Sequence, residues 1–342
     1  MNPQPDQEFN NQSTPHCQIA KLSNYQIVHW HTVGIYKLQQ KGLSMKKYFL
    51  FVLLCIGTNG VIKAQDRITN DPDSASIITT DITHFWMAFD SLTSQRTSTD
   101  SLRIIKKILV DQASEGLSEY MNAAGCHEKE YLETIRRRKA DYLAIRAKTE
   151  AIAGKKQLLL QYLNRFKQLY PAVRIPAICF TIGKFEVGGT QFEKTLYIGC
   201  EVDIINYVDV ITQSIHELAH FQQKNQNPAT NLDLAMIEGG AEFVCYQVTG
   251  KRTIPATWEY GVAHEAGLWN EFRPRLDSAI NMKWFSDLPD KNKNRPGSLA
   301  YFIGFRICET YWKRHPDKKL ALGIIIEMED PDKLFRESSY YQ

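Results

Sequence analysis

Two histidines and the glutamate between them form the stretch of this 342-residue sequence that is best suited to chemistry. His216 and His220 are four residues apart, so both lie on one face of the chain if the segment is helical. Two imidazoles on one face can bind one metal ion, and Glu217 can take a proton from water at that ion. The H-E-x-x-H spacing therefore predicts a zinc site. The same pattern also occurs by chance, with the histidines as core residues of an apolar helix.

A third ligand is expected further along the chain, because catalytic zinc takes three protein ligands and leaves one position for water or substrate. Glu238 lies in a second helical segment, separated from the first by a loop. Glu242 follows four residues later on the same face and can accept a hydrogen bond from a ligand histidine, which would fix its tautomer. Gly239 and Gly240 are expected to let the two helices approach closely.

Hydrophobic periodicity predicts the helices that must position these residues. Val208 to Gln223 and Leu232 to Val248 have the spacing of amphipathic helices, and Gly250 ends the second. Ser298 to Arg314 predicts a strong helix that opens after a Pro-Gly turn. Pro255 to Arg275 shows no single pattern.

A small sheet is expected before the histidine helix. Residues 178–182 and 195–202 are rich in β-branched and aromatic residues, which predicts a β-hairpin or two neighbouring strands, with Gly188-Gly189 as a turn. Residues 81–170 have a helical pattern that Gly154 is expected to interrupt. The predicted fold class is therefore α+β, mostly helical, with a small β-sheet beside the site helix.

The predicted domain organisation is a single unit over residues 81–342. Its N-terminal helical part is 81–170, and its catalytic part is 171–342. Residues 65–80 are polar and rich in Asp, Ser and Thr, which predicts a flexible linker.

The N-terminal residues predict export. Residues 45–64 have the basic start, short apolar core and small final residue (Ala64) of a secretory signal peptide. The core is shorter than the roughly 20 residues of a membrane span. Because signal peptides begin a chain, residues 1–44 are expected to be a mis-assigned extension. The protein is expected to be periplasmic or extracellular, with membrane anchoring through an uncleaved 45–64 segment as the alternative.

Composition restricts the partners. The chain has 41 basic and 38 acidic residues and no long basic run, so nucleic-acid binding is not expected. No C-x-x-C spacing suggests a cysteine metal site or redox motif. The odd number of cysteines after Ala64 predicts at least one free thiol or an intermolecular bond. The oligomeric state is left open.

The H-E-x-x-H motif and the glutamate-containing motif that follows it resemble those of a known enzyme family. The segment from His216 to His220, followed by Glu238-Gly239-Gly240-Ala241-Glu242-Phe243, is similar to the gluzincin metallopeptidases. In that family a helix with H-E-x-x-H precedes a helix with an N-E-G-x-A-E-Y-like motif, whose first glutamate is the third ligand; here Ile237 stands where Asn is common. Residues 81–312 also resemble an uncharacterised bacterial family of predicted zinc-dependent proteases and, in part, a gliding-motility-associated lipoprotein family.

This resemblance implies an exported zinc peptidase that acts on a peptide or protein, with Glu217 as general base and Glu238 as third ligand. It also implies a downstream donor for the oxyanion, for which Tyr301 and His264 are the candidates. Glu201 follows a β-run like the edge strand that pairs with substrate in gluzincins and is expected to be structural. The alternative is a non-catalytic envelope protein that uses the same scaffold for binding, although the intact Glu217 favours catalysis.

Overall fold

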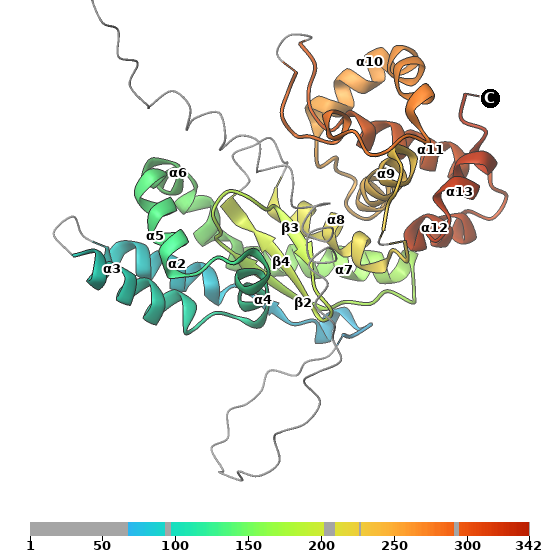
Figure 1. Cartoon of the computed structure of the whole chain (residues 1–342). Coiled ribbons are helices and arrows are strands. Elements are labelled where there is room, and N and C mark those ends of the chain that lie inside the picture. The colour runs from blue at the N-terminus through green and yellow to red at the C-terminus, as the bar shows by residue number, and fades with distance from the viewer. Residues whose placement is uncertain (1–67, 93–96, 202–208, 226, 291–293, 342) are drawn as a thin grey trace, which may run out of the picture.

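The computed structural model describes residues 68–92, 97–201, 209–225, 227–290 and 294–341. These residues form an α+β fold that is mostly helical and contains a small mixed four-stranded sheet (Figure 1). The predicted signal peptide at 45–64 and the extension at 1–44 lie outside the described residues.

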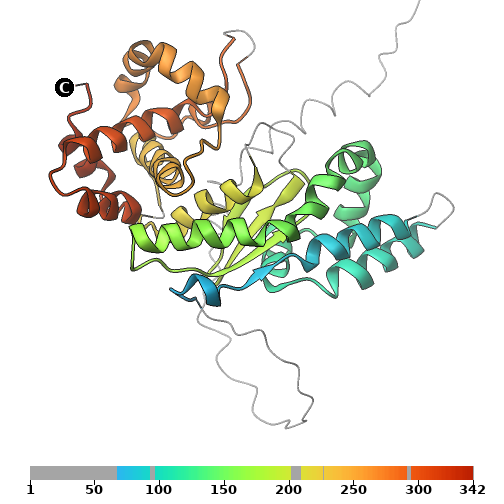
Figure 2. The ribbon, with the colours of Figure 1, turned by 180° about the vertical axis from the view of Figure 1, so that it is seen from behind.

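The N-terminal part is helical, as its periodicity predicts. Its helices are α2 (Thr80–Ser91), α3 (Ser98–Ile105), α4 (Glu115–Ala124), α5 (Glu128–Arg137), α6 (Lys139–Glu150) and α7 (Lys156–Leu169), with a π-helical turn η5 (Lys106–Val110) and a 3-10 turn η6 (Ala151–Lys155). Gly154 lies in η6, which confirms the predicted interruption. Helix α4 packs on the sheet (Figure 1), and α7 runs beside the histidine helix (Figure 2).

The sheet consists of β1 (Ile77–Ile78), β2 (Ala177–Thr181), β3 (Gly189–Gln191) and β4 (Thr195–Gly199), in the spatial order β1-β2-β4-β3. Strands β2 and β4 are parallel neighbours, so the hairpin alternative is wrong and the neighbouring-strand alternative is confirmed. Gly189 begins β3 and pairs with Ile198 of β4, so the predicted glycine turn is also wrong. Parallel neighbours cannot be joined by a tight turn, and the connecting segment here forms the antiparallel edge strand β3.

The segment predicted as a flexible linker is ordered from residue 68 onward, so that prediction is wrong for 68–80. Thr69 and Ile175 exchange backbone hydrogen bonds, and β1 pairs in parallel with β2. The polar composition has a local use, because the Asp71 side chain caps a short 3-10 helix, η4 (Pro72–Ser74). Polar residues that cap a turn resemble a linker in composition.

The C-terminal part contains the site helices α8 (Val210–Gln222) and α9 (Asn231–Thr249), followed by α10 (Pro255–Phe272), α11 (Leu299–Arg314), α12 (Lys318–Glu327) and α13 (Pro331–Ser338), with short 3-10 turns η8 (Arg273–Arg275) and η9 (Met282–Trp284). Helices α9 to α13 gather beside the sheet-bearing part, and α8 lies between the two (Figure 1). The helices predicted around the histidines, around Glu238 and after the Pro-Gly turn are confirmed.

Helix α10 occupies the segment for which the sequence showed no single pattern. Its backbone leaves helical geometry at His264, with φ −126° and ψ 16°, so the chain forms a kinked helix. Gly261 accommodates the ring of Phe302, because a Cβ at residue 261 would lie 2.4 Å from that ring. A kink and a glycine contact both break the hydrophobic period, which explains why periodicity did not detect this helix.

The glycine pair after Glu238 does not serve the contact that the sequence suggested. A Cβ on Gly239 would lie 2.2 Å from the backbone nitrogen of Phe305 in α11, and one on Gly240 would lie 2.5 Å from the side chain of Met328. Gly304 of α11 is equally restricted, since a Cβ there would lie 1.7 Å from the carbonyl oxygen of Ala235. Gly239 and Gly304 therefore admit α11 against α9, and Gly240 leaves room for Met328 at the end of α12. The closest contacts of the glycine pair are thus not with α8, where the sequence placed them.

Candidate metal centre

Helix α8 presents the two histidines from a well-anchored start. The side chain of Asp209 accepts a hydrogen bond of 2.9 Å from the backbone nitrogen of Thr212, which caps the helix. Ile215 and Leu218 are buried in the core. Because residues four apart share a face, this anchoring turns His216 and His220 towards the same neighbour, helix α9.

Helix α9 carries the predicted third ligand. Thr230 and Asp233 form a reciprocal capping box at its start, and Gly250 closes its end with a left-handed φ of 71°. The end at Gly250 was predicted from the sequence, whereas the capping box at the start was not. Glu238 lies in the middle of this helix and is 4 % exposed.

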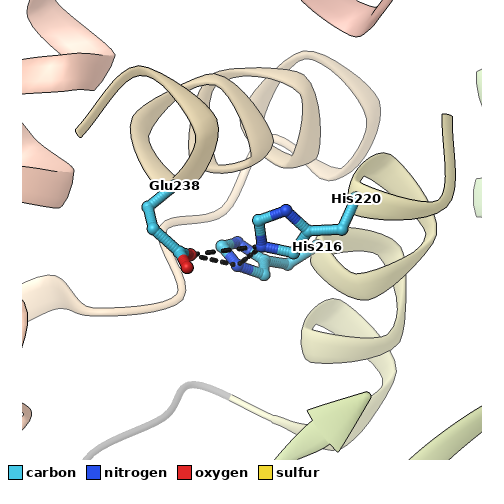
Figure 3. Close-up of side chains that lie close together, drawn as sticks. All are labelled: His216, His220 and Glu238. Atoms are coloured by element: carbon cyan, nitrogen blue, oxygen red, sulfur yellow. Dashed lines mark hydrogen bonds and ion pairs between the residues drawn. The ribbon is translucent and has the colours of Figure 1, made fainter. Parts of the chain in front are cut away.

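The three predicted ligand side chains meet at one point (Figure 3). The Nε2 atoms of His216 and His220 are 3.0 Å apart. Oε2 of Glu238 lies 3.5 Å from Nε2 of His216 and 3.2 Å from Nε2 of His220. Ligand bonds of about 2.0–2.1 Å at tetrahedral angles would separate donor atoms by about 3.3 Å. The donor set thus has the spacing that a tetrahedral zinc ion requires.

The charges of this group depend on one another. Burial alone would lower the pKa of His216, but its hydrogen bonds to Glu238 and Glu242 outweigh burial and raise that pKa well above its usual value. The pKa of His220 is also raised, because the charge of Glu238 outweighs burial. Conversely, burial would raise the pKa of Glu238, but the charge of His220 and the hydrogen bond from His216 lower it well below its usual range. Without a metal ion, His216 and His220 therefore bind protons more tightly than free histidines do, and a divalent cation would displace these protons.

Glu242 lies beside His216, as predicted. Its Oε1 is 2.8 Å from Nδ1 of His216. The carboxylate is itself held by Thr253, whose hydroxyl donates to Oε1 and whose backbone nitrogen lies 3.4 Å from Oε2. Glu242 thus links Nδ1 of His216 to the chain that follows α9.

The sequence did not reveal the corresponding partner of His220. Nδ1 of His220 lies 2.8 Å from Oε1 of Gln223, the residue that ends α8. Gln223 follows His220 by three residues, so helical spacing alone could have placed it on the same face. Its contact with α9, however, depends on how the two helices pack.

Glu217 is buried next to the candidate ligands and is oriented by neighbours on two elements. Nε2 of Gln213, one turn earlier in α8, donates a 2.7 Å hydrogen bond to Oε1 of Glu217. On the other side, a Cβ on Gly189 of β3 would lie 2.4 Å from Cδ of Glu217. The carboxylate therefore packs against the backbone of the edge strand, and its charge acts on both His216 and His220.

The structure separates the two candidate oxyanion donors. The ring of Tyr301 in α11 lies 6.3 Å from the ring of His216, with the planes 9° apart, and the residue is 8 % exposed. His264 is exposed at the kink of α10, where Nδ1 lies 2.8 Å from the carbonyl oxygen of Tyr260. Among the described residues, no contact joins His264 to the ligand group, so only Tyr301 lies beside the site.

Glu201 is buried behind β4 and organises a turn. It accepts backbone hydrogen bonds from Gly183 at 2.8 Å and from Phe185 at 3.2 Å. Burial nevertheless raises the pKa of Glu201 to about 7. The expected structural role agrees with these contacts, but β4 is an inner strand and the edge strand beside the site is β3.

Comparisons of the chain with protein-family models, with curated protein sequences and with solved structures return no match. In the part of the chain that the structure describes, no helix combines the length and the hydrophobicity needed to cross a membrane. The chemistry of the site therefore rests on its own geometry.

Proposed function

We propose that this chain is a zinc-dependent metallopeptidase of the gluzincin type. The proposal rests on the convergence of His216, His220 and Glu238 at tetrahedral spacing, with the carboxylate of Glu217 packed beside them. Three ligands of the nitrogen and oxygen type leave one position for water or substrate, as in catalytic rather than structural zinc sites.

A zinc ion bound by these residues would lower the pKa of water and polarise a substrate carbonyl. The protein groups around it have distinct tasks. Glu217, oriented by Gln213, accepts the proton of the attacking water and returns it to the leaving amine. Tyr301 is the donor that we assign to the oxyanion, because its ring lies beside His216.

The position of β3 supports a peptide as substrate. This strand lies at the edge of the sheet and its first residue, Gly189, contacts Glu217. An edge strand can bind an extended peptide through backbone hydrogen bonds, which would lay the scissile bond beside the general base. The 45–64 segment supports an exported location, in the periplasm or outside the cell, and the balanced charge gives no reason to expect nucleic acid as a partner.

The decisive experiment compares the wild type with Glu217→Gln in metal analysis and in cleavage of a peptide library. We expect one zinc per chain in both proteins and a loss of cleavage of about 10²- to 10⁴-fold in the variant. Glu133→Gln, which changes an exposed glutamate of α5, is the control and should cleave like the wild type.

Two outcomes would contradict the proposal. Stoichiometric zinc without cleavage of any peptide would leave the alternative of a binding protein on the same scaffold. No bound metal in the wild type, together with an unchanged fold in His216→Ala, would exclude both zinc-dependent functions.

A further inference from the structure

Gln223 joins the elements that carry two different ligands. Its backbone caps the end of α8, and the residue is 6 % exposed. Its Oε1 lies 2.8 Å from Nδ1 of His220, and its Nε2 donates a 2.7 Å hydrogen bond to the carbonyl oxygen of Ile237. Ile237 directly precedes Glu238 in α9. One side chain therefore touches the outer nitrogen of one ligand and the backbone next to another.

The neighbours of the carboxamide decide which way it faces. The carbonyl oxygen of Ile237 can only accept a hydrogen bond, so the amino group of Gln223 must face it. The amide oxygen of Gln223 then faces His220, and Nδ1 of His220 must carry the hydrogen. Once a cation displaces the proton on the other ring nitrogen, Nε2 directs its lone pair at the point where His216 and Glu238 meet.

We propose that Gln223 is a positioning residue of the metal centre. It holds His220 in the tautomer that can bind a cation, and it fixes the distance between α8 and the ligand turn of α9. The proposal rests on the metal site of the proposed function, but not on its peptidase activity.

The neighbouring residue Gln222 provides a matched control. It is also buried at the end of α8, at 7 % exposure, and it also bridges two segments. Its carboxamide exchanges two 2.9 Å hydrogen bonds with the backbone of Arg174 and donates to the carbonyl oxygen of Leu218. Loss of Gln222 therefore removes three hydrogen bonds from the same helix end without touching either histidine.

The test measures zinc affinity by competition with a chelator in the wild type, Gln223→Met and Gln222→Met. We expect Gln223→Met to bind zinc about 10- to 100-fold more weakly, as is typical when the hydrogen-bond partner of a ligand histidine is removed. Gln222→Met should bind zinc like the wild type. In NMR spectra of the zinc protein, the Nδ1–H signal of His220 should be protected from exchange in the wild type and Gln222→Met, and lost in Gln223→Met.

Gln223→Asn repeats the test if Gln223→Met does not fold, because its shorter side chain cannot reach both His220 and Ile237. Equal zinc affinity in the wild type and the Gln223 variants would overturn the positioning role while leaving the proposed function intact. An equal loss in the Gln222 variant would also overturn it, since the effect would then come from the helix end. A wild type that binds no zinc would overturn this proposal together with the proposed function.

Discussion

Tyr301 is a single residue whose assigned role depends on where the fold places one hydroxyl group. Tyr301→Phe should lower kcat by about 10²-fold, because one donor to the oxyanion is lost. Zinc affinity should change little, since the donor atoms of the group come from His216, His220 and Glu238 and not from Tyr301. Steady-state kinetics of Tyr301→Phe and His264→Ala test this assignment. Loss of kcat in His264→Ala, with normal kcat in Tyr301→Phe, would reverse it.

The contact between α9 and α11 determines, at the scale of elements, whether Tyr301 faces His216 at all. Replacing a helical glycine by alanine ordinarily stabilises a helix by about 1 kcal/mol. Gly304→Ala should instead destabilise the protein by about 2 kcal/mol or more, because its Cβ would overlap the backbone of Ala235. Gly267→Ala in α10 meets no atom within 4 Å and should be stabilising.

Chemical unfolding of these two glycine variants measures their free energies of unfolding. The free energy of unfolding should fall in Gly304→Ala and rise in Gly267→Ala. A stabilising effect of Gly304→Ala would mean that α9 and α11 are further apart than described.

Glu201 accepts backbone hydrogen bonds from the turn that leads into β3. The stability of this turn should therefore depend on the pH. The folded pKa of Glu201 is about 7, against an ordinary value of 4.5, so folding favours the protonated carboxyl. The contribution of the protonated Glu201 to the free energy of unfolding is therefore complete below about pH 4.5. It is lost as the pH rises towards 7. Between pH 5 and 8 the loss should be about 2 kcal/mol.

Urea unfolding of the wild type and Glu201→Gln at pH 5 and pH 8 tests this linkage. The wild type should lose stability relative to the variant as the pH rises, since glutamine does not ionise. A difference that stays constant with pH would show that Glu201 has an ordinary pKa.

At the scale of the whole molecule, a bound ion would join the sheet-bearing part to the C-terminal helices through α8 and α9. Zinc that binds only the folded state should stabilise it, by about 4 kcal/mol at a free concentration 1,000 times Kd. The raised pKa values of His216 and His220 set the pH dependence. In the metal-free protein their contribution is full below about pH 6.5 and is lost as the pH rises through the raised pKa values.

The zinc-induced rise in Tm should therefore grow from pH 6 to pH 8, because fewer protons compete for the histidines and the metal-free state loses stability. Thermal unfolding with and without zinc measures it, and His216→Ala should show no rise at either pH. A rise in Tm that is larger at pH 6 than at pH 8 would exclude histidine ligation.

The sequence by itself determined the local parts of the site. The face shared by His216 and His220, the helix that carries Glu238 and the end of that helix at Gly250 follow from the helical period and from caps that involve neighbouring residues. These features need no distant contact, so periodicity and capping residues are sufficient to predict them. The α+β class with its small sheet follows from the same local patterns.

Only the tertiary structure decided which segments meet. Strand β1 was hidden in a polar segment because two isoleucines become a strand only when β2 offers its edge. The partner of Gly239 proved to be α11, and the partner of His220 proved to be Gln223. Packing between segments that are distant in the sequence sets these contacts. Periodicity and capping patterns involve only residues close in the sequence, so they cannot predict such contacts. The sequence thus predicted which three side chains come together, whereas the fold determined what holds them in place.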